Sequence, residues 1–376
     1  MMLSKKKKII LLFLIILLCV VSLPAEEKEN ESEEENIVNL EKKKKPGVLV
    51  APILFYLPET RLAFGAAGNF VFRLGKSDSS DRPSSISPVF IYTQNKQFKS
   101  LIDIDMYFKK GKYHLMAFLE FQKYPDKFFG IGSSVPEEQE EDFTPHIFWF
   151  EFTLMKKIKK HLDIGLQYDL YKLNMIEYEE GGLLARGDIP GSAGSLLSGI
   201  IFRAELDSRD NIFSPERGMF FKFSAGFYNK IIGSDFTYQD YRLDLRKYFP
   251  LFSNHVFAVR TIVETQTGTV PFHRLARMGG QYIMRGYFEG RYRDRNLAVL
   301  EAEYRLPLFW RFGVVGFAGA ADVAHRFRDF RFDNLKYSYG FGLRYLFNKK
   351  EKMHIRFDIG FGKGTSGVYF SVFQAF

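Results

Sequence analysis

The sequence predicts an all-β fold, a closed, antiparallel transmembrane β-barrel of about 16 strands that fills residues 48–376. Apolar and polar residues alternate with a period of two from Val48 onward, as in strands with one lipid-facing side and one wet side. These segments recur about every 20 residues, with no helical pattern between them. Short and long connections follow one another in turn, as in barrels with short periplasmic turns and long outer loops.

Residues 1–25 have the pattern of a secretory signal peptide. Lysines at positions 5–8 form a positive region, residues 9–21 form an apolar run of 13, and Ala25 ends a stretch suited to cleavage. The run is too short for a spanning helix, which takes roughly 20 residues. An uncleaved anchor is the alternative.

Cys19 is the only cysteine and lies inside the apolar run, so the mature chain is expected to contain no disulfide. A lipoprotein would have this cysteine as its first mature residue. Leu18 stands where such a signal requires a small residue, so cleavage after Ala25 is the favoured interpretation.

Residues 26–47 are rich in glutamate and then lysine, with almost nothing to bury, and we expect a disordered periplasmic linker. The chain carries a net charge of +9, and removal of the signal with its four lysines leaves +5. This charge is ordinary for the length, so the sequence offers no support for nucleic-acid binding.

The chain is both aromatic and polar, with 41 Phe and 20 Tyr but a mean hydropathy of only −0.16. This combination is typical of a barrel, because lipid-facing residues alternate with wet ones. A soluble sandwich also alternates, but soluble strands average about 5–6 residues, whereas these segments run about 10–13, enough to cross lipid at a tilt. The backbone in lipid must be fully paired, so the sheet is expected to close.

The alternation divides the barrel region into sixteen expected strands. Their ranges are 48–57, 61–74, 86–94, 98–108, 111–122, 146–156, 161–173, 196–207, 217–229, 235–248, 255–267, 296–306, 312–324, 336–347, 352–361 and 367–376. An even number puts both ends of the barrel in the periplasm. Residues 123–145, 174–195 and 268–295 are then long outer loops.

The final segment ends on an aromatic residue. Phe370 and Phe376 share one face of the strand expected at 367–376. A last strand that ends in this way is expected to be read by the barrel-assembly machinery during biogenesis. The alternative is an ordinary alternating strand.

The most specific stretch is residues 278–307, MGGQYIMRGYFEGRYRDRNLAVLEAEYRLP, with Arg285-Gly286-Tyr287 near its start. This stretch, together with SRDNIFSPERG at 208–218, resembles the bacterial surface antigen family, the superfamily of outer-membrane assembly and translocation barrels that includes BamA and TamA. The resemblance implies that Arg-Gly-Tyr lies in the sixth outer loop, which folds into the lumen.

Arg285 offers a planar fork of donors, and Gly286 permits a tight turn. Glu301 and Glu303 lie on one face of the expected strand 296–306, so we predict that Arg285 pairs with Glu301 or Glu303. The alternative is a solvated arginine among the other loop arginines.

The sequence departs from the family in two places. Gly319 stands where the family carries an acid after Phe317, and Asp322 has the opposite parity, so Phe317 and the two glutamates are expected to hold the loop. The family's periplasmic POTRA modules are expected to be absent, since the linker is short. This departure weakens the expectation of client handling.

The sequence contains no convincing catalytic or metal motif. Residues 362–367 formally fit GxGxxG, but they join two strands and precede no helix, so we expect a loop. The seven histidines lack the spacing of a zinc site, and no GxSxG occurs. We therefore expect no enzyme activity, no cofactor and no metal.

Three functions follow from these patterns. The leading hypothesis is an outer-membrane barrel that aids insertion or passage of client polypeptides or lipids, with outer-membrane lipid as its surroundings. Its first strand, which contains Pro52, would meet the last strand at a weak seam. The alternatives are a passive porin-like channel and a structural surface antigen without a transport role.

Overall fold

We describe a computed structural model of the chain at residues 47–57, 61–74, 83–136, 138–349 and 351–376. The chain divides into two units, residues 1–44 and 45–376, and the description concerns the second unit alone. The expected signal peptide at 1–25 lies outside the described residues. So does the expected linker, apart from Gly47, which begins the first strand.

The described residues form an all-β structure, as predicted. The long strands are β1 (Gly47–Leu57), β2 (Arg61–Phe72), β3 (Ser84–Thr93), β4 (Phe98–Phe108), β5 (Tyr113–Lys123), β7 (Glu141–Lys159), β8 (Leu162–Tyr178), β9 (Gly194–Asp207), β10 (Gly218–Tyr228), β11 (Tyr238–Pro250), β12 (Val256–Gly268), β15 (Asn296–Pro307), β16 (Phe312–Ala324), β17 (Lys336–Asn348), β18 (Met353–Gly362) and β19 (Thr365–Val372).

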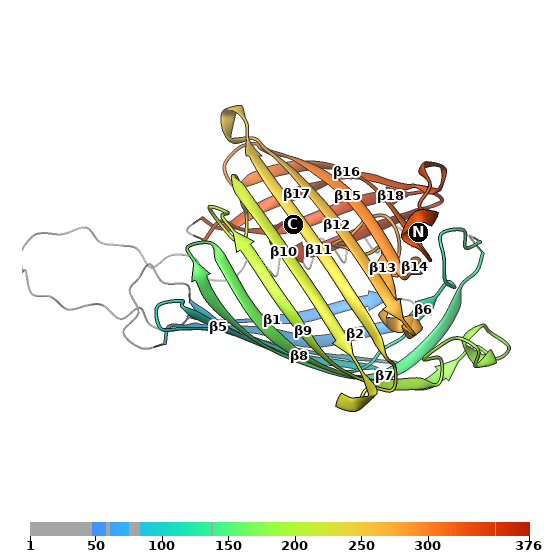
Figure 1. Cartoon of the computed structure of the whole chain (residues 1–376). Coiled ribbons are helices and arrows are strands. Elements are labelled where there is room, and N and C mark those ends of the chain that lie inside the picture. The colour runs from blue at the N-terminus through green and yellow to red at the C-terminus, as the bar shows by residue number, and fades with distance from the viewer. Residues whose placement is uncertain (1–46, 58–60, 75–82, 137, 350) are drawn as a thin grey trace, which may run out of the picture. The chain divides into compact units, whose positions relative to one another are not determined.

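Each long strand pairs antiparallel with the next long strand in the chain, from β1 and β2 to β18 and β19. The short strand β6 (Asp126–Phe128) joins the same 17-stranded sheet by pairing with β7. Among the described residues, no register connects β1 to β19. Figure 1 shows tilted strands lying side by side in a strongly curved sheet.

The two faces of the sheet differ in polarity. On β15, Glu301, Glu303 and Arg305 are buried on the inner face, whereas Leu300 and Tyr304 point outward and are 54% and 37% exposed. β18 repeats the pattern, with Arg356 and Asp358 fully buried between half-buried apolar residues. A wide outward band of apolar side chains is what contact with lipid requires.

Helical structure is limited to short 3-10 turns in the described part of the chain. These are η1 (Leu184–Arg186), η2 (Lys230–Ile232), η3 (Phe252–Asn254), η4 (Phe272–Arg274), η5 (Phe327–Asp329) and η6 (Phe332–Asn334). No helix in the described ranges is both long and apolar enough to cross a membrane.

The long connections contain more structure than the sequence predicted. β7 and β8 extend to 19 and 17 residues, so parts of the expected loops 123–145 and 174–195 are strand. The connection after β12 contains a separate hairpin of β13 (Ala276–Met278) and β14 (Tyr292–Asp294). The alternation signal ended too early because Pro145 sits at a register shift, where β7 bulges.

The last strand was predicted wrongly at its end. β19 ends at Val372 rather than continuing to Phe376, and Phe373 has a positive φ of 71°. Phe370 stays on the outer face, 47% exposed, but Phe376 is 4% exposed and packs with Tyr248 and Ala258. The two phenylalanines therefore do not share a face, because the chain turns inward after β19 and contacts partners that local alternation cannot reveal.

Three of the long connections pack together through an apolar cluster of Phe128, Phe143, Leu184 and Phe272. The ring of Phe272 lies between two others, with centroids 5.3 Å from Phe128 and 5.6 Å from Phe143. Because this cluster joins segments far apart in the chain, it is a tertiary constraint on the loops at this end of the sheet.

We predict that Phe272→Ala loosens these loops, because it removes a fully buried ring, a change that typically costs about 3–5 kcal/mol. Limited proteolysis of the folded protein should show faster cleavage within residues 179–193. Phe332→Ala is the control, since Phe332 is 88% exposed on another loop. Equal cleavage rates in the two variants would contradict the role of the cluster.

Candidate functional site

The candidate site is the segment between β13 and β14 where it meets the inner face of β15, β16 and β18. The segment closes on itself, since the amide of Gly290 donates to the carbonyl of Met278 at 3.0 Å. Its buried side chains Met284 and Tyr287 pack with Leu297 and Val323 on the sheet. Apolar packing therefore holds the segment against the sheet in addition to the charged contacts described next.

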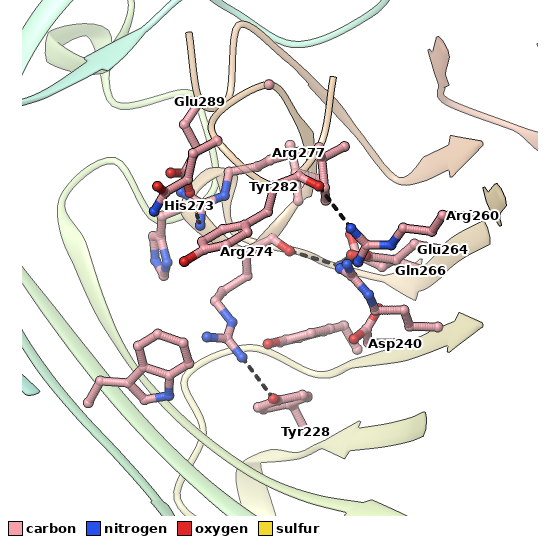
Figure 2. A pocket seen from close by; sticks show the side chains of 17 residues that line it. Tyr228, Asp240, Arg260, Glu264, Gln266, His273, Arg274, Arg277, Tyr282 and Glu289 are labelled. Carbon is pink, nitrogen blue, oxygen red and sulfur yellow. Dashed lines mark hydrogen bonds and ion pairs between the residues drawn. The ribbon is translucent and has the colours of Figure 1, made fainter. Parts of the chain in front are cut away.

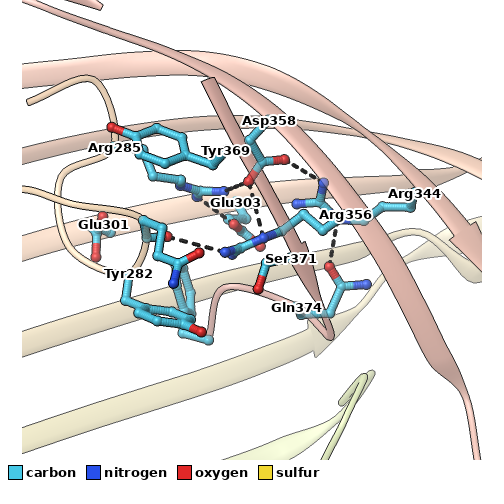
Figure 3. A network of polar contacts seen from close by, with 12 residues as sticks. Tyr282, Arg285, Glu301, Glu303, Arg344, Arg356, Asp358, Tyr369, Ser371 and Gln374 are labelled. Atoms are coloured by element: carbon cyan, nitrogen blue, oxygen red, sulfur yellow. Dashed lines mark hydrogen bonds and ion pairs between the residues drawn. The ribbon is translucent and has the colours of Figure 1, made fainter. Parts of the chain in front are cut away.

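Arg285 lies at the centre of this contact and is 1% exposed (Figure 3). One arm of its guanidinium contacts Glu303 on β15 and the other contacts Asp358 on β18, each at 2.5 Å. Its guanidinium carbon lies 3.6 Å from the centroid of the Phe317 ring on β16. The planar fork therefore joins two carboxylates while its face rests on an aromatic ring.

The two carboxylates have further arginine partners. Glu303 also binds Arg305 at 3.0 Å, and Asp358 also binds Arg344 at 2.5 Å. Burial alone would lower the pKa of Arg285, but Glu303 and Asp358 outweigh burial and raise it. Arg285 is thus held as a cation, and its contacts are of the kind that makes a buried charge tolerable.

Glu301, the other predicted partner of Arg285, binds the backbone instead. It accepts a hydrogen bond at 2.8 Å from the backbone amide of Met284, and it lies opposite Arg260 on β12. Of the two predicted partners, Glu303 pairs with Arg285, while Glu301 fixes the preceding backbone.

Sequence reasoning missed Asp358. The alternation placed it on the inner face of its strand, but nothing in the local sequence relates residue 358 to residue 285. Gly319, where an acid was expected, leaves room for Met284, whose sulfur would lie 2.9 Å from an added Cβ. Asp322 instead binds Lys336 at 2.8 Å.

Gly286 and Tyr287 press the turn against the hairpin of β18 and β19. Gly286 has a φ of 114°, and a Cβ there would lie 2.5 Å from the carbonyl carbon of Phe361. Its amide donates to the Tyr369 hydroxyl at 2.8 Å. The Tyr287 hydroxyl accepts from the amide of Lys363 and donates to the carbonyl of Tyr337, both at 3.0 Å.

The GxGxxG-like stretch gains a structural explanation from this contact. A Cβ added at Gly362 would lie 2.7 Å from the Tyr287 ring, so a side chain there would clash with the loop. β18 and β19 meet in a tight turn at 363–364. Gly362 therefore permits the close approach of the loop that carries Tyr287.

Residues 373–376 lie on the inner side beside this network. The carbonyl of Phe376 accepts from Arg305 at 2.6 Å, and Arg305 also donates to the carbonyl of Pro215 at 3.2 Å. The rings of Phe373 and Phe213 stack at 4.8 Å. The second motif noted in the sequence, residues 208–218, thus contacts the last residues of the chain.

The arrangement is suited to holding strands in place. The segment 284–287 contacts residues of β15 through β19, the strands next to one edge of the described sheet. In the described residues, no three His, Cys, Asp or Glu side chains gather as metal ligands would.

Comparison with known proteins shows a family match and two solved structures of similar fold. Residues 65–376 match the Omp85 superfamily domain. The fold is similar to that of BamA from Haemophilus ducreyi lacking POTRA domains 1–3, with a TM-score of 0.58 and 15% identity over 87% of this chain and 70% of that chain. It is also similar to CdiB from Acinetobacter baumannii, with a TM-score of 0.56 and 13% identity over 87% of this chain and 59% of that chain. Among curated proteins, none matches the sequence.

We predict that Arg285→Ala lowers the free energy of unfolding by about 3–5 kcal/mol, because it leaves buried carboxylates short of a partner. Arg277→Ala is the control from the same loop. Arg277 is 40% exposed and lies 3.4 Å from Glu289, so its removal should cost no more than about 1 kcal/mol. Denaturant unfolding in detergent micelles measures both, and similar losses would contradict the central role of Arg285.

We further predict that Gly286→Ala displaces the turn from β18. The control is Gly132→Ala, since Gly132 has a similar φ of 117° but open space where a Cβ would lie. Both substitutions strain the backbone, but only Gly286→Ala adds a clash, of order 1–3 kcal/mol. Hydrogen exchange in residues 284–287 and 361–369 should rise in that variant alone. Unchanged exchange there would show that close approach is not required.

Proposed function

The chain belongs to the Omp85 superfamily, as its loop motif predicted, and on that premise we propose that it helps proteins or lipids to insert into or pass the outer membrane. It is an outer-membrane β-barrel of the type used in assembly and translocation. The observation that carries the proposal is the Arg285 contact, which braces the strands beside one edge of the sheet.

The working part in this proposal is a seam between β1 and β19. The barrel closes there with sixteen strands, but the seam pairs weakly. Pro52 supports this, because a proline in β1 has no amide to donate to a neighbouring strand. Val48 and Val50 beside it are 70% and 62% exposed. A weak seam between two edges could open sideways into lipid and admit a client strand or an acyl chain.

The Arg285 contact would make such opening possible without unfolding. A strand that separates from its neighbour loses a ladder of hydrogen bonds, and the rest of the sheet must keep its register. The contacts of segment 284–287 with β15, β16, β17, β18 and β19 supply an anchor that does not depend on β1. The Arg285 contact is therefore proposed to keep strands β15 to β19 rigid while β1 moves.

A passive channel is the alternative that the inner side disfavours. The loops at one end pack through Phe128, Phe143 and Phe272, and residues 373–376 lie against residues 208–218 at the other. Both place packed residues at an end of the sheet, where a passive channel would need an opening. A surface antigen without a transport role would have no need of a weak seam. The proposed partners are outer-membrane lipid, the assembly machinery during biogenesis, and a client polypeptide or lipid.

A disulfide across the seam tests the proposal. The only native cysteine is Cys19, so paired cysteines can be placed at Val50 and Phe370, with the neighbouring positions Val48 and Val372 scanned to find the register. The control pair joins Val50 to Gly68, which lie opposite each other in β1 and β2. Both pairs are expressed in a strain depleted of the native protein, and the outer-membrane proteome and lipid content are measured.

We expect the oxidised seam pair to fail to restore the membrane composition, with recovery on reduction. The β1–β2 pair should restore it under both conditions, since those strands stay together. Full restoration by a completely oxidised seam pair would contradict lateral opening. A steady conductance in planar bilayers, with no change in the proteome on depletion, would favour the passive channel instead.

A further inference from the structure

Two neighbouring turns at one end of the sheet carry a dense group of lysines. The turns are residues 109–112, between β4 and β5, and residues 156–161, where β7 ends and β8 begins. Seven lysines stand in them, and we call these seven the lysine patch: Lys109, Lys110, Lys112, Lys156, Lys157, Lys159 and Lys160. All seven are exposed, and neither turn contains an acidic residue. The patch is therefore a strongly positive surface.

The two turns lie side by side because β5 pairs directly with β7. The amide of Lys157 donates to the carbonyl of Lys112 at 2.8 Å. The ammonium nitrogen of Lys157 lies 3.7 Å from the place where a Cβ on Gly111 would stand. Like charges held this close repel one another, so a negatively charged surface against the patch would stabilise it.

Positive charges on the inner side of the sheet are held differently. A cavity of about 410 Å³ lies there, between β10–β12 and the connection after β12 (Figure 2). In its lining, Arg260 contacts Asp244 at 2.7 Å and Arg274 contacts Asp169 at 2.9 Å. In the described part of the chain, by contrast, the ion pairs that lysines form all involve lysines outside the patch. The patch thus keeps its charge available for a partner.

The backbone of the first turn is one that lysine does not favour. Lys109 and Lys110 have φ values of 49° and 58°, in the left-handed region that mostly suits Gly and Asn. Gly111 follows with a φ of 72°. Two ammonium groups therefore stand at the tip of this turn at some cost in backbone conformation, which indicates that the charge itself matters there.

The patch begins where the outward apolar rows of the sheet end. On β7, Phe152 and Leu154 point outward, 39% and 47% exposed, and Lys156 follows on the same face. Tyr113 on β5 lies opposite Lys156, and the ammonium nitrogen of Lys109 lies 5.5 Å from the centroid of the Tyr113 ring. A tyrosine and lysines at the end of an apolar band are typical of the level of the lipid headgroups.

From its charge, its spacing and its position we propose that the lysine patch binds the phosphate groups of anionic phospholipids in the adjoining leaflet. Clusters of about four to eight basic residues beside a membrane segment are typical of such binding. An acidic polypeptide would also match the charge, but it would have no use for the apolar rows and the tyrosine that lead up to the patch. The proposal concerns the lipid around the barrel and holds whether or not the seam opens.

Quenching of tryptophan fluorescence by brominated lipid tests the proposal, because it acts only at contact range. The chain has two tryptophans, Trp149 on β7 and Trp310 in the turn between β15 and β16, far from the patch in the sheet. Trp149→Phe leaves Trp310, which is 71% exposed, as a control reporter. Adding Trp310→Phe and Ile158→Trp moves the single reporter into the patch, since Ile158 is 50% exposed on the second turn.

Both full chains are reconstituted into vesicles of phosphatidylglycerol, which is anionic, and phosphatidylcholine, which carries no net charge. The bromine is placed on one lipid or on the other at a fixed composition. The ratio of the two quenching values gives the local enrichment of the anionic lipid. We expect about threefold or greater enrichment at the Ile158→Trp reporter and little at Trp310, with a decrease at high salt because salt screens exposed charges.

Charge removal identifies the residues responsible. In the chain with the Ile158→Trp reporter, the enrichment should disappear on combining Lys109→Gln, Lys110→Gln and Lys157→Gln. It should persist in a matched control with three lysines replaced elsewhere at the same end of the sheet, Lys247→Gln, Lys349→Gln and Lys352→Gln. Circular dichroism checks that each variant stays folded.

Three results would overturn the proposal. Equal quenching by the two brominated lipids at the Ile158→Trp reporter would show that the patch has no preference for anionic lipid. Equal enrichment at both reporters would trace the effect to the charge of the whole protein. Binding of polyglutamate at the Ile158→Trp reporter without any lipid enrichment would make the patch a docking surface for an acidic polypeptide.

Discussion

The structure depends on one buried cation, Arg285, held between Glu303 and Asp358. Removing a charge from water is costly, so a buried arginine is stable only where its partners are fixed in position. Those partners come from β15 and β18, and the ring beneath comes from β16. The constraint therefore applies to the register of three strands at once, and it ties a long loop to the wall of the sheet.

Close approach of the backbone makes that contact possible. Gly286 sits against Phe361, and Gly362 leaves room for the Tyr287 ring. Without side chains at these positions, the turn can descend onto β18 and β19 and bring Arg285 within reach of Asp358. Met284 fills the space left by Gly319, so the position that lacks the expected acid contributes to packing.

The Arg285 contact also determines where the neighbouring residues of its loop lie. Because the turn at 284–287 is drawn toward β15–β19, the residues just before it, including Tyr282, lie over β11 and β12 and form one side of the cavity. On the other side of the network, Arg305 connects Glu303 to the carbonyls of Pro215 and Phe376. The loop, the 208–218 turn and the last residues are thus linked through neighbouring arginines and carboxylates.

The sequence by itself determined the all-β antiparallel fold, most strand positions, the family and the pairing of Arg285 with one of two glutamates, because alternation and a short motif are local properties of the chain. It correctly placed Glu301 and Glu303 on one face of their strand. It could not show that Asp358 meets Arg285, that Glu301 binds a backbone amide, or that Phe376 turns inward. Those contacts depend on how segments 17 to more than 70 residues apart are brought together, and only the tertiary structure decides which buried charges become neighbours.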